Sequence, residues 1–368
     1  MAVYTTIDDP SVHFQCDKYT AGSGTDTVTF DGNSNLQPDL IWVKSMDTAY
    51  NHQFHDSSRG ATTGAMYTNL GDAEDSTYHV DNFLTDGYIN DSVNTAIHAN
   101  TEDIMSYGWK ANGGTTSSVS ASGSGASSVA ASTYQADTTS KFSICTWTGT
   151  DDTAAATITH GLGVAPEFII VKCRNEASTN WTIYHHKNTA SPETDILEFD
   201  SGATADNDRF NDTAPTSTVF SVNASSGTVN AENDTYVAYC WAGVQGYSKF
   251  GSYEGNGSTN GAFIYTGFKP ACVLLKNTEA TEHWILYDTK RNTFNVMGNK
   301  LSPSANNTAP NGAPGLGDAA YNMIDMYSNG FKMRSNNAGS NSDDVAYIYA
   351  AFAEEPLVTS GGVPATAR

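Results

Sequence analysis

Basic residues are scarce in this chain of 368 residues, which has 18 lysines and arginines against 40 aspartates and glutamates. The formal net charge of −22 repels phosphate backbones, and no local basic patch offsets it, so we expect no nucleic-acid binding. No apolar run approaches the roughly 20 residues that a membrane span needs, and residues 1–10 lack the features of a signal peptide. We therefore expect no membrane insertion and read the acidity as a solubility feature.

Cysteine is also rare, and its pattern argues against disulfide or zinc chemistry. The five cysteines are Cys16, Cys145, Cys173, Cys240 and Cys272. Their number is odd, no CxxC occurs, and nearly all lie in apolar patterns typical of strands. Their spacing offers no four-ligand zinc cluster. We expect buried, reduced thiols, which fits assembly in a reducing cytoplasm.

The motifs of common enzyme classes are missing. The chain contains no GxSxG, no HExxH, no phosphate loop and no dinucleotide fingerprint. His185 and His186 suggest a metal pair, but adjacent residues on a strand point to opposite faces. We predict that the protein is not an enzyme and has no cofactor. We assign no catalytic, cofactor-binding or metal-ligating residue, and the binding residues are unknown.

Two acidic segments are candidates for calcium binding. Their residues are Asp72, Glu74 and Asp75 in one segment and Asp206, Asp208 and Asp212 in the other. Neither segment has the spacing of a defined calcium loop with its closing glutamate. Solvated loops are the favoured interpretation, and calcium binding stays open.

One phrase occurs three times, with a period of roughly a hundred residues. It consists of a proline, a run of apolar strand formers, and a lysine six residues on, at 38–44, 166–172 and 270–276. A repeat of this length indicates an array of related modules. Because each run is continuous and apolar, we predict a central strand buried on both faces in every module.

Matching residues flank each copy of the phrase. Aromatic residues precede the three prolines by 19, 19 and 17 residues: Tyr19, Trp147 and Tyr253. Another set follows the prolines by 14, 15 and 14 residues: His52, Trp181 and Trp284. Each copy closes on two aromatic residues that are 21 residues apart: Tyr88 and Trp109, Phe220 and Trp241, Phe331 and Phe352. We infer one fold used three times, with most tryptophans on buried strands rather than on sugar-binding loops.

Glycine, threonine, asparagine and serine fill the turns, and no segment shows convincing helical periodicity. Seven or eight short strands per hundred residues predict an all-β chain of three tandem antiparallel β-sandwich modules, of jelly-roll or lectin-like type. The expected parts are module 1 at 1–111, a Ser/Gly/Ala-rich linker or insertion at 112–139, module 2 at 140–246, module 3 at 247–356, and a C-terminal tail at 357–368.

In the first module the pattern predicts individual strands and one bend. The expected strands cover 13–19, 27–30, 39–44, 53–56, 66–70, 88 onward and 104–110. Residues 82–87 are interpreted as the approach to a turn, with Asp86 and Gly87 supplying the bend.

An Asp-x-x-Arg signature occurs in two of the three modules. Asp56 precedes Arg59, and Asp288 precedes Arg291, whereas the second module has His185 and Asn188. A catalytic pair would not usually be lost in one copy of three, so we favour an Asp–Arg pair across a turn that stabilises the fold. Sugar or carboxylate binding, and catalysis, are the alternatives.

The segment at 112–139 breaks the repeat, since it is almost wholly serine, glycine, alanine and threonine. The default interpretation is a flexible linker. If the segment is ordered, something must offset about 1–2 kcal/mol of backbone entropy per residue. Packing on a neighbouring subunit is then our hypothesis.

Several phrases resemble a family of tail-fibre-like structural proteins from marine bacteriophages. They are Tyr4–Pro10, Pro38–Lys44, Ser58–Gly60, Tyr107–Lys110, Phe250–Gly257, Tyr265–Pro270, Ser328–Arg334, Tyr347–Glu354 and Gly362–Arg368. The similarity spans nearly the whole chain except the Ser/Gly/Ala-rich segment. These motifs mark the fold of the family and carry no known catalytic role, so no site residue is transferred.

The resemblance implies a virion structural protein, assembled in the host cytoplasm, that acts as a tail fibre or a tail-associated adhesin for host recognition. The expected partners are other virion proteins, further copies of this chain (a trimer above all), and a host surface glycan or protein. The alternatives are a capsid decoration or head-attached appendage without a receptor role and, last, a glycan depolymerase.

Overall fold

Strands dominate the computed structural model, which describes residues 5–91, 94, 97, 101–123, 128–150, 155–199, 202–224, 227–306 and 323–366. Tyr4, Arg368 and residues 124–127, which belong to segments discussed above, lie outside this part of the chain. The short 3₁₀ turns named in it are η1 (Pro10–Val12), η3 (Pro192–Thr194) and η4 (Asp208–Phe210). Among the described residues, no helix is long and apolar enough to span a membrane. The predicted all-β class is confirmed.

Module 1 comprises β1 to β8 and consists of two sheets with a shared core. The larger sheet has the strand order β1-β8-β3-β4-β5, and the smaller has β2-β7-β6. The strands are β1 (Phe14–Thr20), β2 (Thr27–Val28), β3 (Leu40–Ser45), β4 (Gln53–Asp56), β5 (Met66–Tyr67), β6 (Val80–Phe83), β7 (Tyr88–Asn90) and β8 (Asp103–Trp109). Side chains from both sheets, such as Ile41 and Tyr88, form one apolar cluster between them.

Module 2 comprises β9 to β19. Its larger sheet has the order β15-β14-β19-β12-β11-β9, faced by β10-β13-β18, and β16 pairs with β17. The strands are β9 (Ser117–Val119), β10 (Ser128–Val129), β11 (Ser132–Asp137), β12 (Phe142–Thr148), β13 (Ala156–Thr159), β14 (Phe168–Cys173), β15 (Thr182–His185), β16 (Asp195–Ile196), β17 (Ala205–Asp206), β18 (Val219–Val222) and β19 (Thr235–Trp241). The pairing of β10 with β13 is parallel, unlike the other pairings described between strands.

Module 3 comprises β20 to β26. Its sheets have the orders β20-β26-β22-β23 and β21-β25-β24. The strands are β20 (Ser248–Glu254), β21 (Phe263–Tyr265), β22 (Phe268–Asn277), β23 (Ile285–Asp288), β24 (Ile324–Tyr327), β25 (Gly330–Met333) and β26 (Ala346–Pro356). In every module the first long strand and the last one pair side by side: β1 with β8, β12 with β19, and β20 with β26.

The repeated phrase forms β3, β14 and β22, and each of these strands is buried along its whole length. Alternate side chains face opposite cores, as the pleat of a strand requires. In β3, Leu40 and Trp42 belong to a cluster shared between modules, whereas Ile41 and Val43 belong to the core within module 1. The prediction of a strand buried on both faces is confirmed.

Three local predictions in module 1 need correction, and one holds. Residues 82–83 belong to β6, so they are not only a turn approach, and β2 and β5 are shorter than the predicted 27–30 and 66–70. In β6 a buried residue precedes two exposed residues and one of intermediate exposure, so no alternating pattern indicates the strand. The predicted bend at Gly87 holds: its φ is +87°, and a Cβ atom there would lie 1.9 Å from the Val28 carbonyl oxygen.

The segment at 112–139 is not a free linker in its described residues. Its strand β11 pairs antiparallel with β12, and β9 pairs with β11, so the segment extends the edge of the module 2 sheet. The segment is therefore held by its own chain, and the ladder of hydrogen bonds offsets the cost of ordering it. The predicted packing on a neighbouring subunit is not needed to explain its order.

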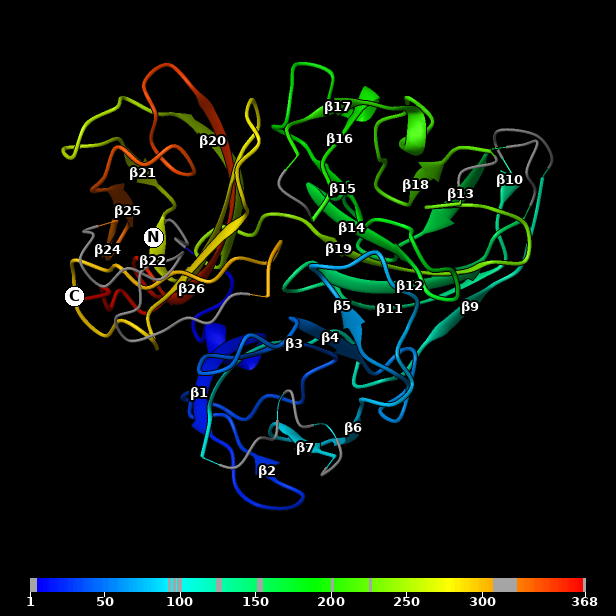
Figure 1. The fold of residues 1–368 in the computed structure, drawn as a ribbon, viewed down its shortest axis with the longest axis horizontal. Helices are drawn as coiled ribbons and strands as arrows, with labels where there is room; N and C mark the ends of the chain where they lie inside the picture. The colour runs from blue at the N-terminus through cyan, green and yellow to red at the C-terminus, as the bar shows by residue number, and fades with distance from the viewer. Residues whose placement is uncertain are drawn as a thin grey trace.

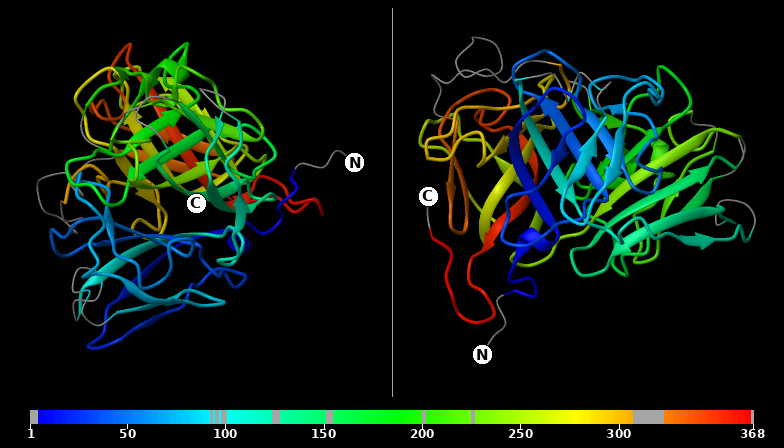
Figure 2. Two further views of the ribbon diagram at one scale, coloured as in Figure 1. Left: turned by 90° about the vertical axis from the view of Figure 1, so that its right-hand side faces the viewer. Right: turned by 90° about the horizontal axis from the view of Figure 1, so that it is seen from below.

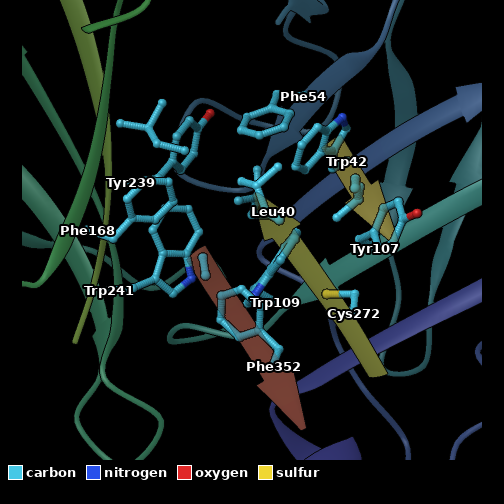
Figure 3. Packing of buried hydrophobic residues seen from close by; sticks show 14 of the residues in the cluster. Leu40, Trp42, Phe54, Tyr107, Trp109, Phe168, Tyr239, Trp241, Cys272 and Phe352 are labelled. Carbon is cyan, nitrogen blue, oxygen red and sulfur yellow. The ribbon is translucent and has the colours of Figure 1, made fainter. Parts of the chain in front are cut away.

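The three modules form three lobes around a common centre (Figure 1). Side chains from the larger sheet of each module meet there, among them Trp109, Trp241 and Phe352 at equivalent positions of β8, β19 and β26 (Figure 3). Trp241 lies 5.9 Å from Trp109 and 6.4 Å from Phe352 between ring centroids. The end segments lie side by side (Figure 2), and the Ser360 backbone N–H donates to Asp8 at 2.6 Å.

The lysine that closes each repeated phrase is buried and caps the next loop. Lys44 donates to the Thr48 carbonyl at 3.0 Å, Lys172 to the Thr179 carbonyl at 2.8 Å, and Lys276 to the Glu282 carbonyl at 2.5 Å. Burial lowers the pKa of Lys44 to about 7 and that of Lys172 to about 8. The lysine is thus conserved among the copies as a structural cap.

We predict that Trp241→Ala lowers the free energy of unfolding by about 3–5 kcal/mol, because the cavity would open where all three modules meet. Urea unfolding should remain one transition, since the core is shared. The matched control is Phe294→Ala, whose side chain is 78% exposed and should change stability by no more than about 0.5 kcal/mol. Equal effects of the two substitutions would contradict the central role of this core.

Candidate functional site at the module interfaces

The two Asp-x-x-Arg signatures lie at contacts between modules. In module 1, Arg59 Nε donates to Asp56 Oδ2 at 2.5 Å, and the Tyr239 hydroxyl of module 2 donates to the same oxygen at 2.6 Å. In module 3, Arg291 pairs with Asp288, which accepts a bond of 2.7 Å from the Tyr107 hydroxyl of module 1. The predicted Asp–Arg pair is confirmed, and a tyrosine that the sequence analysis did not single out completes each site.

Because Asp56, Arg59 and Tyr239 are buried, each of these side chains depends on the others for its charge or hydrogen-bond partner. The side chains of Asp56 and Arg59 are 0% and 1% exposed. Burial opposes the charge of Arg59, yet the Asp56 carboxylate outweighs it and raises the pKa of the guanidinium. Burial and then Asp56 raise the pKa of Tyr239, which keeps its hydroxyl protonated as a donor. This arrangement fixes the positions of the Asp56, Arg59 and Tyr239 side chains and leaves none of them exposed to solvent as a nucleophile.

At the interface between modules 2 and 3, both the aspartate and the tyrosine are replaced by other residues. By strand register, Ala350 of module 3 stands where Tyr107 and Tyr239 stand, and His185 of module 2 stands in place of the aspartate. His185 Nε2 instead lies 3.1 Å from the Tyr349 carbonyl oxygen. Burial first, and then His186, lowers the pKa of His185 to about 3. At this interface the aspartate and the tyrosine are therefore both replaced, and no buried carboxylate is left without a donor.

A second bond repeats around the molecule. The Trp181 Nε1 of module 2 donates to the Tyr67 carbonyl of module 1 at 2.8 Å, and the Trp284 Nε1 of module 3 donates to the Glu198 carbonyl of module 2 at 2.7 Å. His52 occupies the equivalent place in module 1. Its carbonyl accepts from the Thr68 backbone N–H, and Thr68 Oγ1 donates to the Pro303 carbonyl of module 3 at 2.8 Å. Each module thus contacts the next in the same cyclic order.

Grooves lie near the rims of two interfaces, and each is lined by residues of two modules. We name the grooves by the modules that form them: groove 1/3 with a volume of about 450 Å³ and groove 2/3 with a volume of about 540 Å³. The two residues after His185 line groove 2/3, and the two after Asp288 line groove 1/3: His186 and Lys187, and Thr289 and Lys290. Ser57 and Ser58, which follow Asp56, are the equivalent pair in module 1. Ser57 and Ser58 mark the corresponding place between modules 1 and 2, groove 1/2.

Groove 1/2 is filled by the inserted strand β11. Gln135 is 1% exposed, and its Nε2 donates to Ser57 Oγ at 2.8 Å and to Ser58 Oγ at 2.7 Å. Its Oε1 accepts from the backbone N–H groups of Asn112 and Gly114 at 3.2 and 3.1 Å. Both polar ends of the carboxamide are therefore satisfied, and the segment at 112–139 closes this interface.

Groove 1/3 is acidic and contains an internal ion pair. Lys290 of module 3 pairs with Asp31 of module 1 across it. Asp17 lies on the adjacent strand β1, where burial and then Asp31 raise the pKa of its carboxyl to about 6. Glu354 and Glu355 line the same groove.

Groove 2/3 carries two lysines and a partly exposed aromatic ring. Its lining includes Glu167 and Lys187 from module 2 and Lys249 and Tyr265 from module 3. His186 Nε2 lies 2.9 Å from the Phe250 carbonyl oxygen and 3.6 Å from Glu167 Oε2. The strand β15 ends at His185, so the prediction for adjacent strand residues does not apply to His186, and the two ring centroids lie 5.5 Å apart.

The acidic candidates for calcium take part in other contacts. Glu74 accepts from Arg59 and from Arg174 of module 2, both at 2.9 Å, so it joins modules 1 and 2. Asp75 accepts from the Tyr67 hydroxyl at 2.7 Å. In the second segment, Asp208 accepts from the Asn223 amide at 2.9 Å. These contacts give the carboxylates structural roles.

One other set of metal-type ligands occurs within the described residues: His79, Asp81 and Asp91. His79 Nδ1 lies 3.1 Å from Asp91 Oδ2, whereas the other ring nitrogen lies 3.8 Å from Asp81 Oδ1. Because a metal ion binds one ring nitrogen, this arrangement, with the two carboxylates at different nitrogens of His79, does not favour a shared ion.

The cysteines and tryptophans are buried, as the sequence analysis predicted. All five cysteines are free and buried. All six tryptophans are buried: Trp42, Trp109, Trp147, Trp181, Trp241 and Trp284. The exposed aromatic rings are instead Phe263, Tyr265 and Phe294 among the described residues. Nothing in the repeat pattern singled them out, because they lie outside its matched positions.

The chain belongs to the family described as a domain of unknown function, DUF7483, which matches residues 9–356. This match spans all three modules. Neither a curated protein nor a solved structure shows a significant match.

We expect Arg59→Ala to lower the free energy of unfolding by about 3–5 kcal/mol, because it leaves the Asp56 carboxylate buried without its counter-ion. Lys18→Ala is the control, since Lys18 and its partner Asp103 are 34% and 26% exposed and the loss of this pair should cost less than about 1 kcal/mol. Thermal and urea unfolding measure both. An Arg59→Ala protein with an unchanged melting temperature and abolished cell binding would show a binding role instead.

Acid should destabilise the protein through its buried neutral histidines. Burial lowers the pKa of both His55 and His185 to about 3, helped by Arg59 and His186 respectively. The unfolded chain takes up these protons near pH 6.5, so the stability is present above about pH 6.5 and is lost as the pH falls toward 3.

Between pH 8 and pH 5 we expect a loss of about 2 kcal/mol for each of these histidines. Urea unfolding across this range should show a smaller pH slope for His185→Gln than for the unsubstituted protein. The slope is the readout, because the substitution also changes stability at every pH. Equal slopes would refute the assignment of a depressed pKa to His185.

Proposed function

We propose that this protein is a bacteriophage virion structural protein, a tail fibre or tail-associated adhesin that recognises the host surface. The observation that carries the proposal is the construction of the molecule. Three sandwich modules share one aromatic core, and their buried ionisable groups hold the modules together. A rigid block of this kind presents its loops and grooves in fixed positions, which suits surface recognition. The resemblance to tail-fibre-like proteins supplies the viral context.

The proposed partners are other virion proteins, further copies of this chain and a host surface glycan or protein. A trimer is the proposed oligomer, by analogy with the resembled family. The buried Asp–Arg–Tyr contacts support a protein that is not an enzyme, because these groups are enclosed and paired. Assembly would take place in the host cytoplasm, and the mature location would be the virion.

A capsid decoration or head-attached appendage without a receptor role is the second candidate. The observation that favours it is the compact, three-lobed shape of the described chain, with its end segments side by side (Figures 1 and 2). A classical fibre would call for an elongated shaft. A glycan depolymerase is the least favoured candidate.

Localisation in intact particles tests the proposal. Gold-labelled antibodies against the purified chain should bind at the tail in electron micrographs of the virion, and soluble protein should compete with particles for host cells. Density on the capsomers would instead establish the decoration role. A parallel incubation with host surface polysaccharide should release no reducing ends, and their release would overturn the assignment as a non-enzyme.

A further inference from the structure

Among the described residues, no side chain occupies the position at Lys187 in groove 2/3 in the way found at the two equivalent positions. In groove 1/2 the occupant is the carboxamide of Gln135, and in groove 1/3 it is the carboxylate of Asp31. Both occupants are planar groups with two polar atoms, and both meet the residue at the same repeat position, Ser58 or Lys290. The two occupied copies therefore indicate which chemical groups this position can bind.

The chemistry of the occupant follows the residue at that position. Ser58 offers a hydroxyl oxygen to the Gln135 amide, so the occupant places a donor there. Lys290 is only a donor, and the occupant there is a carboxylate acceptor. Lys187 is the equivalent residue of groove 2/3, so a carboxylate is the complementary group.

Lys187 is available for such a ligand. Its side chain is exposed, and no hydrogen bond or ion pair of its ammonium group is found within the described part of the chain. Lys249 lies on the facing module, donates to the Tyr265 carbonyl at 2.6 Å and lies 5.5 Å from the centre of the Tyr265 ring. Two lysines against the single carboxylate of Glu167 make the lining locally basic in a chain with a net charge of −22.

The exposed ring of Tyr265 favours a saccharide among the classes of carboxylate ligand. Tyr265 is 53% exposed and borders the groove with an accessible apolar surface beside hydrogen-bonding groups. Such a combination suits a pyranose ring, which has apolar C–H faces and polar edges. The groove volume of about 540 Å³ lies in the range of small-ligand sites, rather than of protein docking surfaces.

We propose that groove 2/3 binds a uronic-acid residue of an acidic saccharide, with its carboxylate at Lys187 and its ring against Tyr265. Glu167 lies beside His186 on the module 2 side and would disfavour a second carboxylate close by. This inference deepens the proposed function, because it names the class of host glycan. At the equivalent position of the other two interfaces, Ser58 and Lys290 are already paired with Gln135 and Asp31 of the same chain.

The test is calorimetric titration of the purified full chain with tetragalacturonate and with its methyl ester, which has the same rings without the charges. We expect saturable binding of the acid and at least about tenfold weaker binding of the ester. Lys187→Gln should weaken binding of the acid by about ten- to hundredfold, and Tyr265→Ala should weaken both ligands. Lys290→Gln is the matched control and should leave the affinity unchanged.

Unchanged melting temperatures of the Lys187 and Tyr265 variants establish that these exposed substitutions leave the fold intact. No binding of the acid, equal binding of acid and ester, or equal affinity of the Lys187→Gln protein would overturn the inference. Binding of polyglutamate in place of the saccharide would assign the groove to an acidic peptide and likewise overturn it. Tail location or host-cell competition without uronate binding would refute this inference alone, whereas uronate binding by a capsid protein would refute the proposed location alone.

Discussion

The whole arrangement depends on the two apolar faces of the large sheets. A two-layer sandwich covers one face of each sheet with its own smaller sheet. The other face of β3, β14 and β22 carries Trp42, Ile170 and Leu274, which belong to the shared cluster. Exposing these faces to water would be costly, so each module covers part of the others. Three modules in one chain thereby form a single core instead of a string of independent domains.

Polar contacts around this core set the order and spacing of the modules. Apolar packing has little directionality, whereas a buried carboxylate must be paired and hydrogen-bonded. Asp56 takes its partners from Arg59 of its own module and from Tyr239 of the next, so it stabilises only the correct docking. The interface without a tyrosine also lacks the aspartate, because an aspartate there would be buried without that donor.

The copies differ both in the core and at the rim. Equivalent core positions stay buried but vary in size, as Trp42, Ile170 and Leu274 do, so the modules fill the shared core together rather than identically. At the grooves, one position holds serine, lysine and lysine in turn, and the neighbouring chain differs each time. The inserted strand β11 adds an edge strand to the module 2 sheet and places Gln135 against Ser57 and Ser58 of module 1.

Several features could be predicted from residue order alone. The Pro-to-Lys phrase identified the central strands, the turn chemistry of Asp86-Gly87 identified a bend, and the apolar patterns placed the cysteines and tryptophans inside. The short strand β6 was hidden because its burial pattern does not alternate. The inserted strands were hidden because serine, glycine and alanine are typical of linkers, and only the free edge of β12 gives them a pairing partner.

By itself, the sequence determined the all-β class and the threefold repetition of strands, since both depend on local patterns of side chains. Only the tertiary structure decided that the modules close around one core, that Tyr107 and Tyr239 complete the Asp–Arg pairs, and that Lys187 has no side-chain partner among the described residues where Ser58 and Lys290 have one. The physical reason is distance along the chain. Tyr239 and Asp56 are 183 residues apart, and no local pattern encodes a contact that forms only when separate modules dock.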